Sequence, residues 1–150
     1  MTESDDTTLV RPRPILDEVT AFYWEAAGKG RLAALRCDTC RRFHHPPDIA
    51  CPHCGGTALH PETVSGRGTV FAATVVRQAF DRAFADAVPY TVALVELEEQ
   101  PGLKVLTNLV GADATTPVAV GTPVELVVEP HGDWSLPQFR VATSGLEREG

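Results

Sequence analysis

Hydrophobic and polar residues alternate along the second half of the chain, as they do in half-buried β-strands. The alternation runs through five segments, at 68–77, 90–98, 103–110, 124–129 and 139–143. No long helical pattern separates these segments, and the turn Glu99–Gly102 joins the second and third as a hairpin. Five short strands in close succession predict a small closed or nearly closed barrel.

A helical rhythm, with apolar residues mostly three and four apart, precedes the barrel. It begins near Ile15–Asp17, after two prolines, and Gly28 and Gly30 end it. We predict a helix whose apolar stripe comprises Ile15, Val19, Phe22, Tyr23 and Ala26. The aromatic run Phe22–Trp24 suits docking against the domain or a partner subunit, and stacking on a ligand is the alternative.

All four cysteines lie in one window, as two Cys-x2-Cys pairs at 37–40 and 51–54. Each pair presents two thiolates to one ion, and two pairs complete a tetrahedral site. We therefore predict one structural Zn²⁺ per chain, held by Cys37, Cys40, Cys51 and Cys54. Redox dithiols or disulfides are the alternative. Because four thiolates leave no open coordination position, this zinc is expected to stabilise a fold and not to catalyse.

Other residues of this window have simpler expected roles. A short strand at 31–36 leads into the first cysteine pair, and residues 41–47 form a turn joining two ribbon strands. His44, His45 and His53 lie beside the cysteines, but four thiolates already fill a zinc shell. We expect none of the three histidines to bind the metal.

Two connections are longer than a five-stranded barrel needs, at 79–89 and 130–138. In an OB-fold, loops at these places line the usual binding face. Phe80, Arg82 and Phe84 in the first connection and Trp134 in the second are therefore candidate ligand or partner contacts. The alternative is that the aromatic residues cover the open end of the barrel.

Twenty acidic residues against thirteen basic ones give a net charge of −7, which opposes non-specific binding of nucleic acid. Eleven of the thirteen basic residues are arginines, and Arg31, Arg36, Arg41 and Arg42 gather around the predicted ribbon. Because arginine binds phosphate in a bidentate way, the nucleotide tail of coenzyme A is a plausible guest. Ordinary surface arginines are the alternative.

Motifs of the common catalytic sites are missing from the sequence. It has no Gly-x-Ser-x-Gly, no Gly-rich phosphate loop before Lys-Ser/Thr and no His-Glu-x-x-His. If zinc takes all four cysteines, none is left as a nucleophile. No segment is apolar enough to span a membrane, and the acidic start Met1–Asp6 is unlike a secretory signal. We expect a cytoplasmic protein that is not an enzyme on its own.

The order of these motifs resembles a bacterial and archaeal family of acyl-CoA-associated proteins that join a rubredoxin-like zinc ribbon to an OB-fold. The resembling pieces are Phe22–Glu25, Cys37–Gly55, Ser65–Val70, Val88–Leu97 and Thr107–Gly111, within a span from about Leu16 to Val141. The expected architecture is thus mainly β. It comprises a disordered tail (1–14), a helix with a zinc ribbon (15–64), a five-stranded OB-fold barrel (65–143) and a C-terminal tail (144–150).

The resemblance implies a non-catalytic subunit that binds and stabilises a thiolase-superfamily acyl-CoA enzyme. Such partners include ketothiolases, retro-aldolases that cleave sterol side chains, and acyltransferases, and the subunit would help form the acyl-CoA entrance. A MaoC-like enoyl-CoA hydratase is another implied partner. Candidate contacts with a partner, or with the coenzyme A thioester it binds, are Phe22, Tyr23, Trp24, Arg41, Arg42, Phe80, Arg82, Phe84 and Trp134.

Two hypotheses from other functional classes stay open. Fold analogy alone suggests a single-stranded nucleic-acid binder, because ribbons and OB-folds both serve that role elsewhere. The barrel carries few basic residues for it, namely Arg67, Arg77, Arg82, Lys104 and Arg140. The other hypothesis is an independent enzyme that acts on a thioester.

Overall fold

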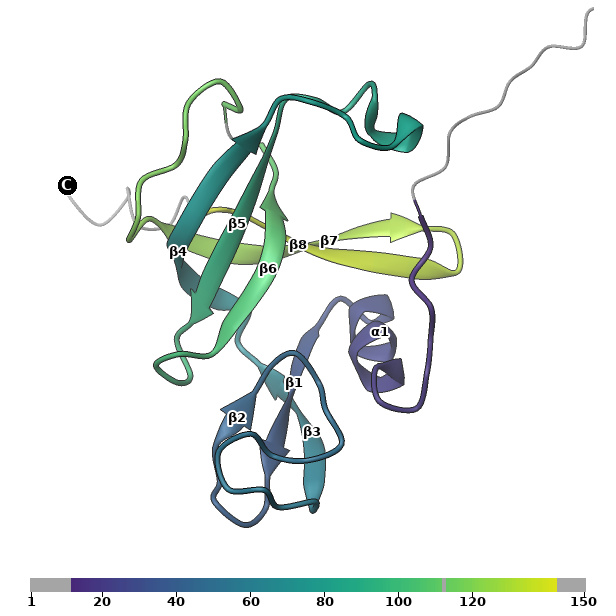
Figure 1. Cartoon of the computed structure of the whole chain (residues 1–150), viewed down its shortest axis with the longest axis vertical. Coiled ribbons are helices and arrows are strands. Elements are labelled where there is room, and N and C mark those ends of the chain that lie inside the picture. The colour runs from purple at the N-terminus through teal and green to yellow at the C-terminus, as the bar shows by residue number, and fades with distance from the viewer. Residues whose placement is uncertain (1–11, 112, 143–150) are drawn as a thin grey trace, which may run out of the picture.

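A computed structural model describes residues 12–111 and 113–142 of the chain. One helix and a three-stranded sheet lie beside a closed five-stranded barrel (Figure 1), which confirms the predicted mainly β fold class. The first sheet contains β1 (Leu32–Cys37), β2 (Phe43–His44) and β3 (Leu59–Val64), after the helix α1 (Ala21–Gly28). The barrel contains β4 (Arg67–Val76), β5 (Tyr90–Leu97), β6 (Lys104–Leu109), β7 (Pro123–His131) and β8 (Trp134–Val141), with a short 3₁₀ helix η1 (Arg82–Phe84) before β5.

The barrel closes in the strand order β4-β5-β6-β8-β7. All its pairings are antiparallel except that of β6 with β8, which is parallel and rests on the single pair Leu109↔Phe139. Alternation predicts β5 well, because Thr91, Ala93, Val95 and Leu97 are all buried while the residues between them are partly exposed. The inward-facing residues thus form the barrel core that the period-two pattern predicts.

The ribbon sheet has the order β2-β1-β3, with the buried strand β1 in the centre. The segment 41–47, predicted as a plain turn, contains the two-residue strand β2. The strand β3 was not predicted, because His60-Pro61-Glu62 reads as a turn. Pro61 is tolerated since β3 is the edge strand of this sheet and needs no donor on its outer side.

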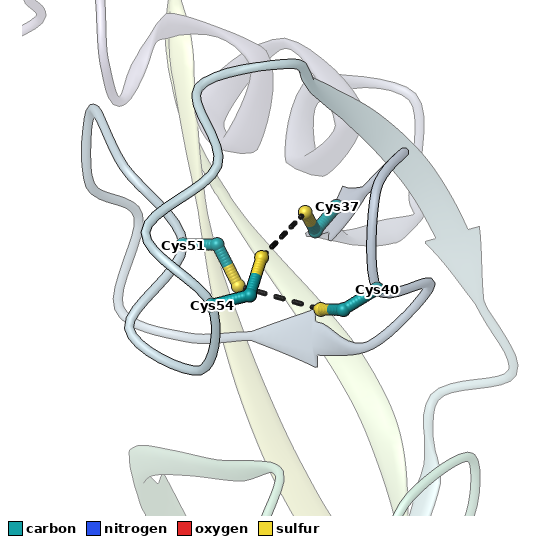
Figure 2. Close-up of side chains that lie close together, drawn as sticks. All are labelled: Cys37, Cys40, Cys51 and Cys54. Atoms are coloured by element: carbon teal, nitrogen blue, oxygen red, sulfur yellow. Dashed lines mark hydrogen bonds between the residues drawn. The ribbon is translucent and has the colours of Figure 1, made fainter.

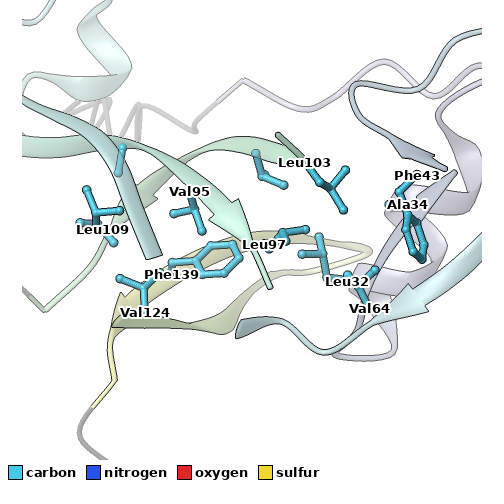
Figure 3. Close-up of a cluster of buried hydrophobic side chains, with 13 residues drawn as sticks. Leu32, Ala34, Phe43, Val64, Val95, Leu97, Leu103, Leu109, Val124 and Phe139 are labelled. Atoms are coloured by element: carbon cyan, nitrogen blue, oxygen red, sulfur yellow. The ribbon is translucent and has the colours of Figure 1, made fainter. Parts of the chain in front are cut away.

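Ribbon and barrel share one hydrophobic core (Figure 3). Side chains of the ribbon, Leu32, Ala34, Phe43 and Val64, continue a cluster of barrel side chains that includes Val95, Leu97, Leu103 and Phe139. The side chain of Gln100, in the β5–β6 turn, adds polar contacts across the same junction. Its Oε1 accepts a hydrogen bond from the Phe43 N–H at 2.9 Å, and its Nε2 donates to the Phe43 carbonyl at 2.9 Å.

The helix is shorter than predicted and begins at Ala21, not near Ile15. The Asp17 carboxylate accepts hydrogen bonds from the N–H groups of Val19 and Thr20, which holds residues 17–20 in a local turn. Ile15 is 88% exposed and therefore lies outside the apolar stripe. Among the described residues, no helix is long and apolar enough to cross a membrane.

The predicted long connection at 130–138 is also wrong. Strands β7 and β8 continue through it and meet in a tight hairpin at Gly132, whose φ is 72°. In Figure 1 this hairpin projects beyond the barrel above α1, and α1 packs against β8. The two longest barrel connections are equal in length and run over 77–89, between β4 and β5, and over 110–122, between β6 and β7. The predicted tails, 1–14 and 144–150, lie outside the described residues apart from Pro12–Pro14.

Candidate zinc centre and aromatic groove

The four cysteines meet at one point of the ribbon (Figure 2). Their Sγ atoms all lie within 4.8 Å of one another, with 3.6 Å between Cys37 and Cys54 and 3.6 Å between Cys40 and Cys51. A tetrahedral zinc with Zn–S bonds of about 2.3 Å requires sulfur separations of about 3.8 Å. The four sulfurs therefore fit a zinc ion, as the spacing of the cysteines predicts.

Local backbone geometry supports the sulfurs. The N–H of His53 points at Cys51 Sγ and that of Gly56 at Cys54 Sγ, both at 3.4 Å. Gly55 has a φ of 78°, which favours glycine in the turn after the second cysteine pair. A Cβ on Gly56 would lie 3.3 Å from two of the sulfurs, so the backbone passes close to the site.

The electrostatics of the sulfurs also call for a cation. Hydrogen bonds from the backbone N–H groups of Cys40 and Thr39 lower the pKa of Cys37 to about 6, against the effect of burial. The Gly56 N–H favours the thiolate of Cys54. The neighbouring Cys37 sulfur and burial oppose the thiolate more strongly in sum, so the pKa of Cys54 is raised to about 11. Four thiolates in contact repel one another unless a metal neutralises them. Bound zinc would supply that charge and link the two cysteine pairs.

The three neighbouring histidines lie outside the sulfur cluster. Among the described residues, the cluster of possible metal ligands comprises the four cysteines alone. The ring of His53 contacts the Phe43 carbonyl at 3.2 Å, and His45 packs against the Tyr23 ring with centroids 5.5 Å apart. His44 is buried on β2 and belongs to the ribbon interior.

A second feature is an aromatic groove between α1, the barrel and the β7–β8 hairpin. One part, of about 500 Å³, is lined by Trp24, Phe84 and Trp134 together with residues of β5 and β6. The rings of Trp24 and Trp134 meet edge to face at 6.2 Å. An adjoining part of about 340 Å³ shares Trp24 with the first and adds Tyr23 and the buried Gln138. We call the two parts together the aromatic groove.

Some candidate residues from the sequence meet in this groove and others do not. Tyr23, Trp24, Phe84 and Trp134 line it, although they come from three separate segments. Candidate residues absent from its lining are Phe22, Arg41, Arg42, Phe80 and Arg82. Arg41 and Arg42 lie instead beside the cysteine pair of the ribbon, and Phe80 is 88% exposed.

Sequence reasoning missed other residues that line the groove: Tyr90, Val92, Leu106, Asn108, Leu136 and Gln138. The first four are outward-facing positions of predicted strands, because their neighbours along β5 and β6 are buried. The sequence did contain a signal for this groove, namely apolar residues at strand positions that face outward. A solvent-facing strand position is ordinarily polar, so Val92 and Leu106 indicate a covered or ligand-binding face.

Comparison with family models and solved structures identifies the family of this chain. The family model for the rubredoxin-like zinc ribbon domain of ChsH2 matches residues 24–60, and that for the C-terminal OB-fold domain of ChsH2 matches residues 61–129. The chain belongs to the ChsH2 (DUF35) family. Both modules of the family are present, in the predicted order, and the family resemblance of the sequence is confirmed.

A solved relative has the same fold over nearly the whole described chain. The chain is similar to a chain of the Ltp2-ChsH2(DUF35) aldolase, with 39% sequence identity and a TM-score of 0.76 over 87% of this chain and 100% of that one. A DUF35 protein of unknown function from Sulfolobus solfataricus matches with 16% identity and a TM-score of 0.59, over 83% of this chain and 86% of that one, and shows the fold alone.

Curated relatives of the ChsH2 family carry two kinds of name. A probable enoyl-CoA hydratase alpha subunit from Thermomonospora curvata is 40% identical over 89% of this chain, and a 3-oxo-4,17-pregnadiene-20-carboxyl-CoA hydratase alpha subunit from Mycobacterium tuberculosis is 38% identical over 88%. The chain spans 40% of the length of each of these two proteins. A DUF35 domain-containing scaffold protein from Methanothermobacter thermautotrophicus is 34% identical over 64% of this chain and 70% of its own length.

Proposed function

We propose that this chain is a scaffold subunit that binds and stabilises a thiolase-superfamily acyl-CoA enzyme and has no activity of its own. The similarity to the ChsH2(DUF35) chain of an aldolase, at 39% identity over that whole chain, carries this proposal. The zinc centre is coordinatively closed, so it supports a structural role for the ribbon. The aromatic groove supplies an apolar surface, with two tryptophans, of the kind that forms the centre of protein interfaces.

Co-expression with a thiolase-like enzyme encoded beside this chain tests the proposal. We expect the two proteins to co-purify as a hetero-oligomer, and the enzyme to lose solubility and activity when this chain is omitted. An enzyme that is equally soluble and active alone would overturn the proposal. Turnover of a thioester by this chain in isolation would contradict its non-catalytic part.

Two matched variants test whether the aromatic groove takes part. Trp134→Ala removes an aromatic wall, and truncation of a buried interface tryptophan typically costs about 2 kcal/mol or more, or roughly thirtyfold in Kd. Ile49→Ala is the control, since Ile49 is 74% exposed and does not line the groove. Equal affinities of the two variants for the enzyme would place the interface elsewhere on the chain.

The finer proposal is that this chain helps form the acyl-CoA entrance of the partner. It predicts that a complex with a groove variant retains kcat but shows a raised KM for acyl-CoA. An unchanged KM with every groove variant would limit the role of the chain to stabilising the enzyme.

Association with an enoyl-CoA hydratase is a second candidate function. It is favoured by the two hydratase alpha subunits that are 40% and 38% identical to this chain. Co-expression with a MaoC-like hydratase encoded nearby distinguishes the candidates. Under this candidate the hydratase, and not a thiolase-like enzyme, co-purifies with the chain.

A further inference from the structure

One edge of β6 carries backbone groups that no other described strand pairs. The Leu97 N–H donates to the Leu103 carbonyl at 2.8 Å, so odd-numbered residues of this strand direct their N–H and C=O groups toward β5. Even-numbered residues face the opposite edge, where the Val110 N–H donates to the Phe139 carbonyl at 2.9 Å. The N–H and C=O of Leu106 and the N–H of Asn108 point to this edge, before the single residue pair that joins β6 to β8.

The edge is open because β8 leaves β6 after one pair. Their parallel pairing rests on Leu109↔Phe139, and before it the two strands diverge around the aromatic groove. Leu106 and Asn108 lie on one side of the opening, and Leu136 and Gln138 lie on the other.

The β8 side of the opening also has unmet hydrogen-bonding capacity. Since the Phe139 carbonyl faces β6, the carbonyl of Pro137, two residues earlier, faces the same gap. The side chain of Gln138 is 98% buried and its Nε2 has no partner. A buried amide without a partner is costly, which indicates that a guest with a carbonyl group completes this site.

The charges along the groove indicate whether its ligand is charged or neutral. Arg13, its basic lining residue, is held at 2.6 Å by Asp133, and His131 at the hairpin lies 2.6 Å from Glu129. Among the residues that the structure describes, the groove lining therefore offers no uncompensated positive charge to a phosphate group. Its apolar walls and open strand edge instead match an uncharged extended peptide, whose backbone supplies both N–H and C=O groups.

We propose that an extended, uncharged segment of the partner enzyme lies in the aromatic groove and pairs with the open edge of β6 as an added strand. This inference rests on the proposed function, because the partner enzyme supplies the segment. It assigns the peptide backbone to Leu106 and Asn108, and a backbone carbonyl to Gln138 Nε2. The side chains of the segment that face Trp24 and Trp134 are apolar.

Hydrogen exchange resolved to single amides tests this pairing in the complex with the co-encoded thiolase-like enzyme. We expect the N–H groups of Leu106 and Asn108 to exchange at least about tenfold more slowly in the complex than in the free chain, because each gains a hydrogen bond. A complex in which both amides exchange as fast as in the free chain overturns the inference and leaves the proposed function intact. Failure to form a complex overturns both.

Two substitutions at one position supply a second measurement. Leu106→Pro removes the outward N–H and leaves the hydrogen bonds to β5, since Leu106 does not bond to that strand. Leu106→Val keeps the N–H and is the matched control. Provided that both variants melt as the parent chain does, we expect Leu106→Pro to weaken the complex by about tenfold, and Leu106→Val by less than threefold. Equal weakening by both variants would contradict strand pairing, and if Leu106→Pro fails to fold, the exchange experiment decides.

Other occupants of the groove give distinct outcomes. If the Leu106 amide is already protected in the free chain and sedimentation shows a dimer, a second copy covers the edge. If it is protected in a monomer and becomes exposed on removal of residues 1–11, the N-terminal segment of the chain covers it. Either result overturns the assignment to the partner enzyme.

Discussion

Gly68 stands where a neighbouring strand leaves no room for a side chain, and Gly56 stands where the cysteine sulfurs leave little room. A Cβ on Gly68, in β4, would lie 2.3 Å from the backbone carbonyl of Glu96 on the neighbouring strand, which cannot move without breaking the barrel. A Cβ on Gly56 would lie 3.3 Å from two zinc-centre sulfurs. At these two positions, the absence of a Cβ atom lets β4 approach β5 and lets the ribbon backbone pass close to the cysteine sulfurs.

Gly68→Ala should destabilise the chain by about 3 kcal/mol, because overpacking against a backbone atom forces the two strands apart. Gly28→Ala, at the helix end, is the matched control, since its Cβ would meet nothing within 4 Å. Urea unfolding of both variants measures the effect. A Gly68 variant as stable as the Gly28 variant would contradict the close approach of β4 and β5 at this position.

Cys51→Ser should abolish stoichiometric zinc, because three thiolates and a hydroxyl no longer complete the site. His53→Ala, two residues away, should keep about one zinc per chain, since its ring contacts the Phe43 carbonyl and not the sulfur cluster. Metal analysis by mass spectrometry compares the two variants. Folded parent chain purified without zinc or another metal would contradict the assignment.

The ring of His45 should stay neutral well below the usual pKa of histidine. Burial, and to a lesser degree the nearby His44, lowers the pKa of His45 to about 4. The unfolded chain then binds more protons than the folded chain between about pH 6.5 and 4. Stability is therefore expected to fall as the pH drops through this window, by at most about 3 kcal/mol from this group.

Proton NMR follows the His45 ring directly, separately from acid release of zinc. Its Hε1 resonance should hardly shift between pH 7 and 5. A midpoint above pH 6 would contradict the burial of this ring against Tyr23.

Among the structural elements, the β5–β6 turn does more than reverse the chain. Gln100 in this turn pairs with both backbone groups of Phe43 in β2, as a neighbouring strand would. A side-chain amide thus extends the ribbon sheet to the barrel. The contact joins residues 57 positions apart and fixes how the two modules pack.

Gln100→Glu keeps the oxygen acceptor and loses the donor, so the Phe43 carbonyl faces a carboxylate. We expect a loss of stability of about 1–3 kcal/mol, because the partly buried Phe43 carbonyl loses the hydrogen bond from Gln100 and faces a carboxylate in its place. Glu98→Gln is the control, since its exposed ion pair with Arg67 contributes little. Thermal melts of the two variants should separate clearly, and equal melting temperatures would contradict a structural role for Gln100.

The elements also show what the sequence could and could not predict. The strand β5 is predictable because every second residue along it is buried, so its burial follows the period-two pattern of the sequence without interruption. The hairpin β7–β8 is not, since Pro130 and Pro137 within it read as loop residues. Both prolines occupy positions that need no donor, because Ser135 and Pro137 turn their backbone groups away from β7. Whether a proline in a strand lacks a needed donor depends on which strand pairs with it and in which register. The order of residues along the sequence does not give this information.

The zinc centre and the aromatic groove differ in the same way. Four cysteines at fixed spacing lie in one window, so local sequence is enough to predict their site. The groove brings together Trp24, Phe84 and Trp134 from three distant segments, and only the fold does this. Sequence reasoning therefore found Tyr23, Trp24, Phe84 and Trp134 as candidates, but it missed Tyr90 and could not give the arrangement of these rings.

For the whole molecule, the shared core makes ribbon and barrel one folding unit. Leu32, Phe43 and Val64 of the ribbon pack in the same cluster as Leu97 and Leu103 of the barrel. Ribbon and barrel therefore should not unfold independently. Loss of structure in one exposes apolar surface of the other, at a cost of about 25 cal/mol for each Å².

Removal of zinc should therefore lower the stability of the barrel as well as the ribbon. In the presence of a chelator, we expect a single thermal transition at a lower temperature, reported alike by ribbon and barrel resonances. Two separate transitions, with the barrel melting as it does in the zinc-loaded chain, would contradict a common folding unit.

The boundary between the two family models has a consequence for how this chain can be divided. It falls between residues 60 and 61, inside β3, whose residues 59–64 pair with β1 along the whole strand. A fragment that begins at residue 61 would lose the first two of the six residues of this edge strand, together with the whole of β1. Without the ribbon side chains, Leu97 and Leu103 of the barrel would be uncovered. Recombination or gene fusion at that boundary should thus yield insoluble products, whereas transfer of ribbon and barrel together preserves the core. In this chain, the unit that can be transferred intact is therefore ribbon and barrel together.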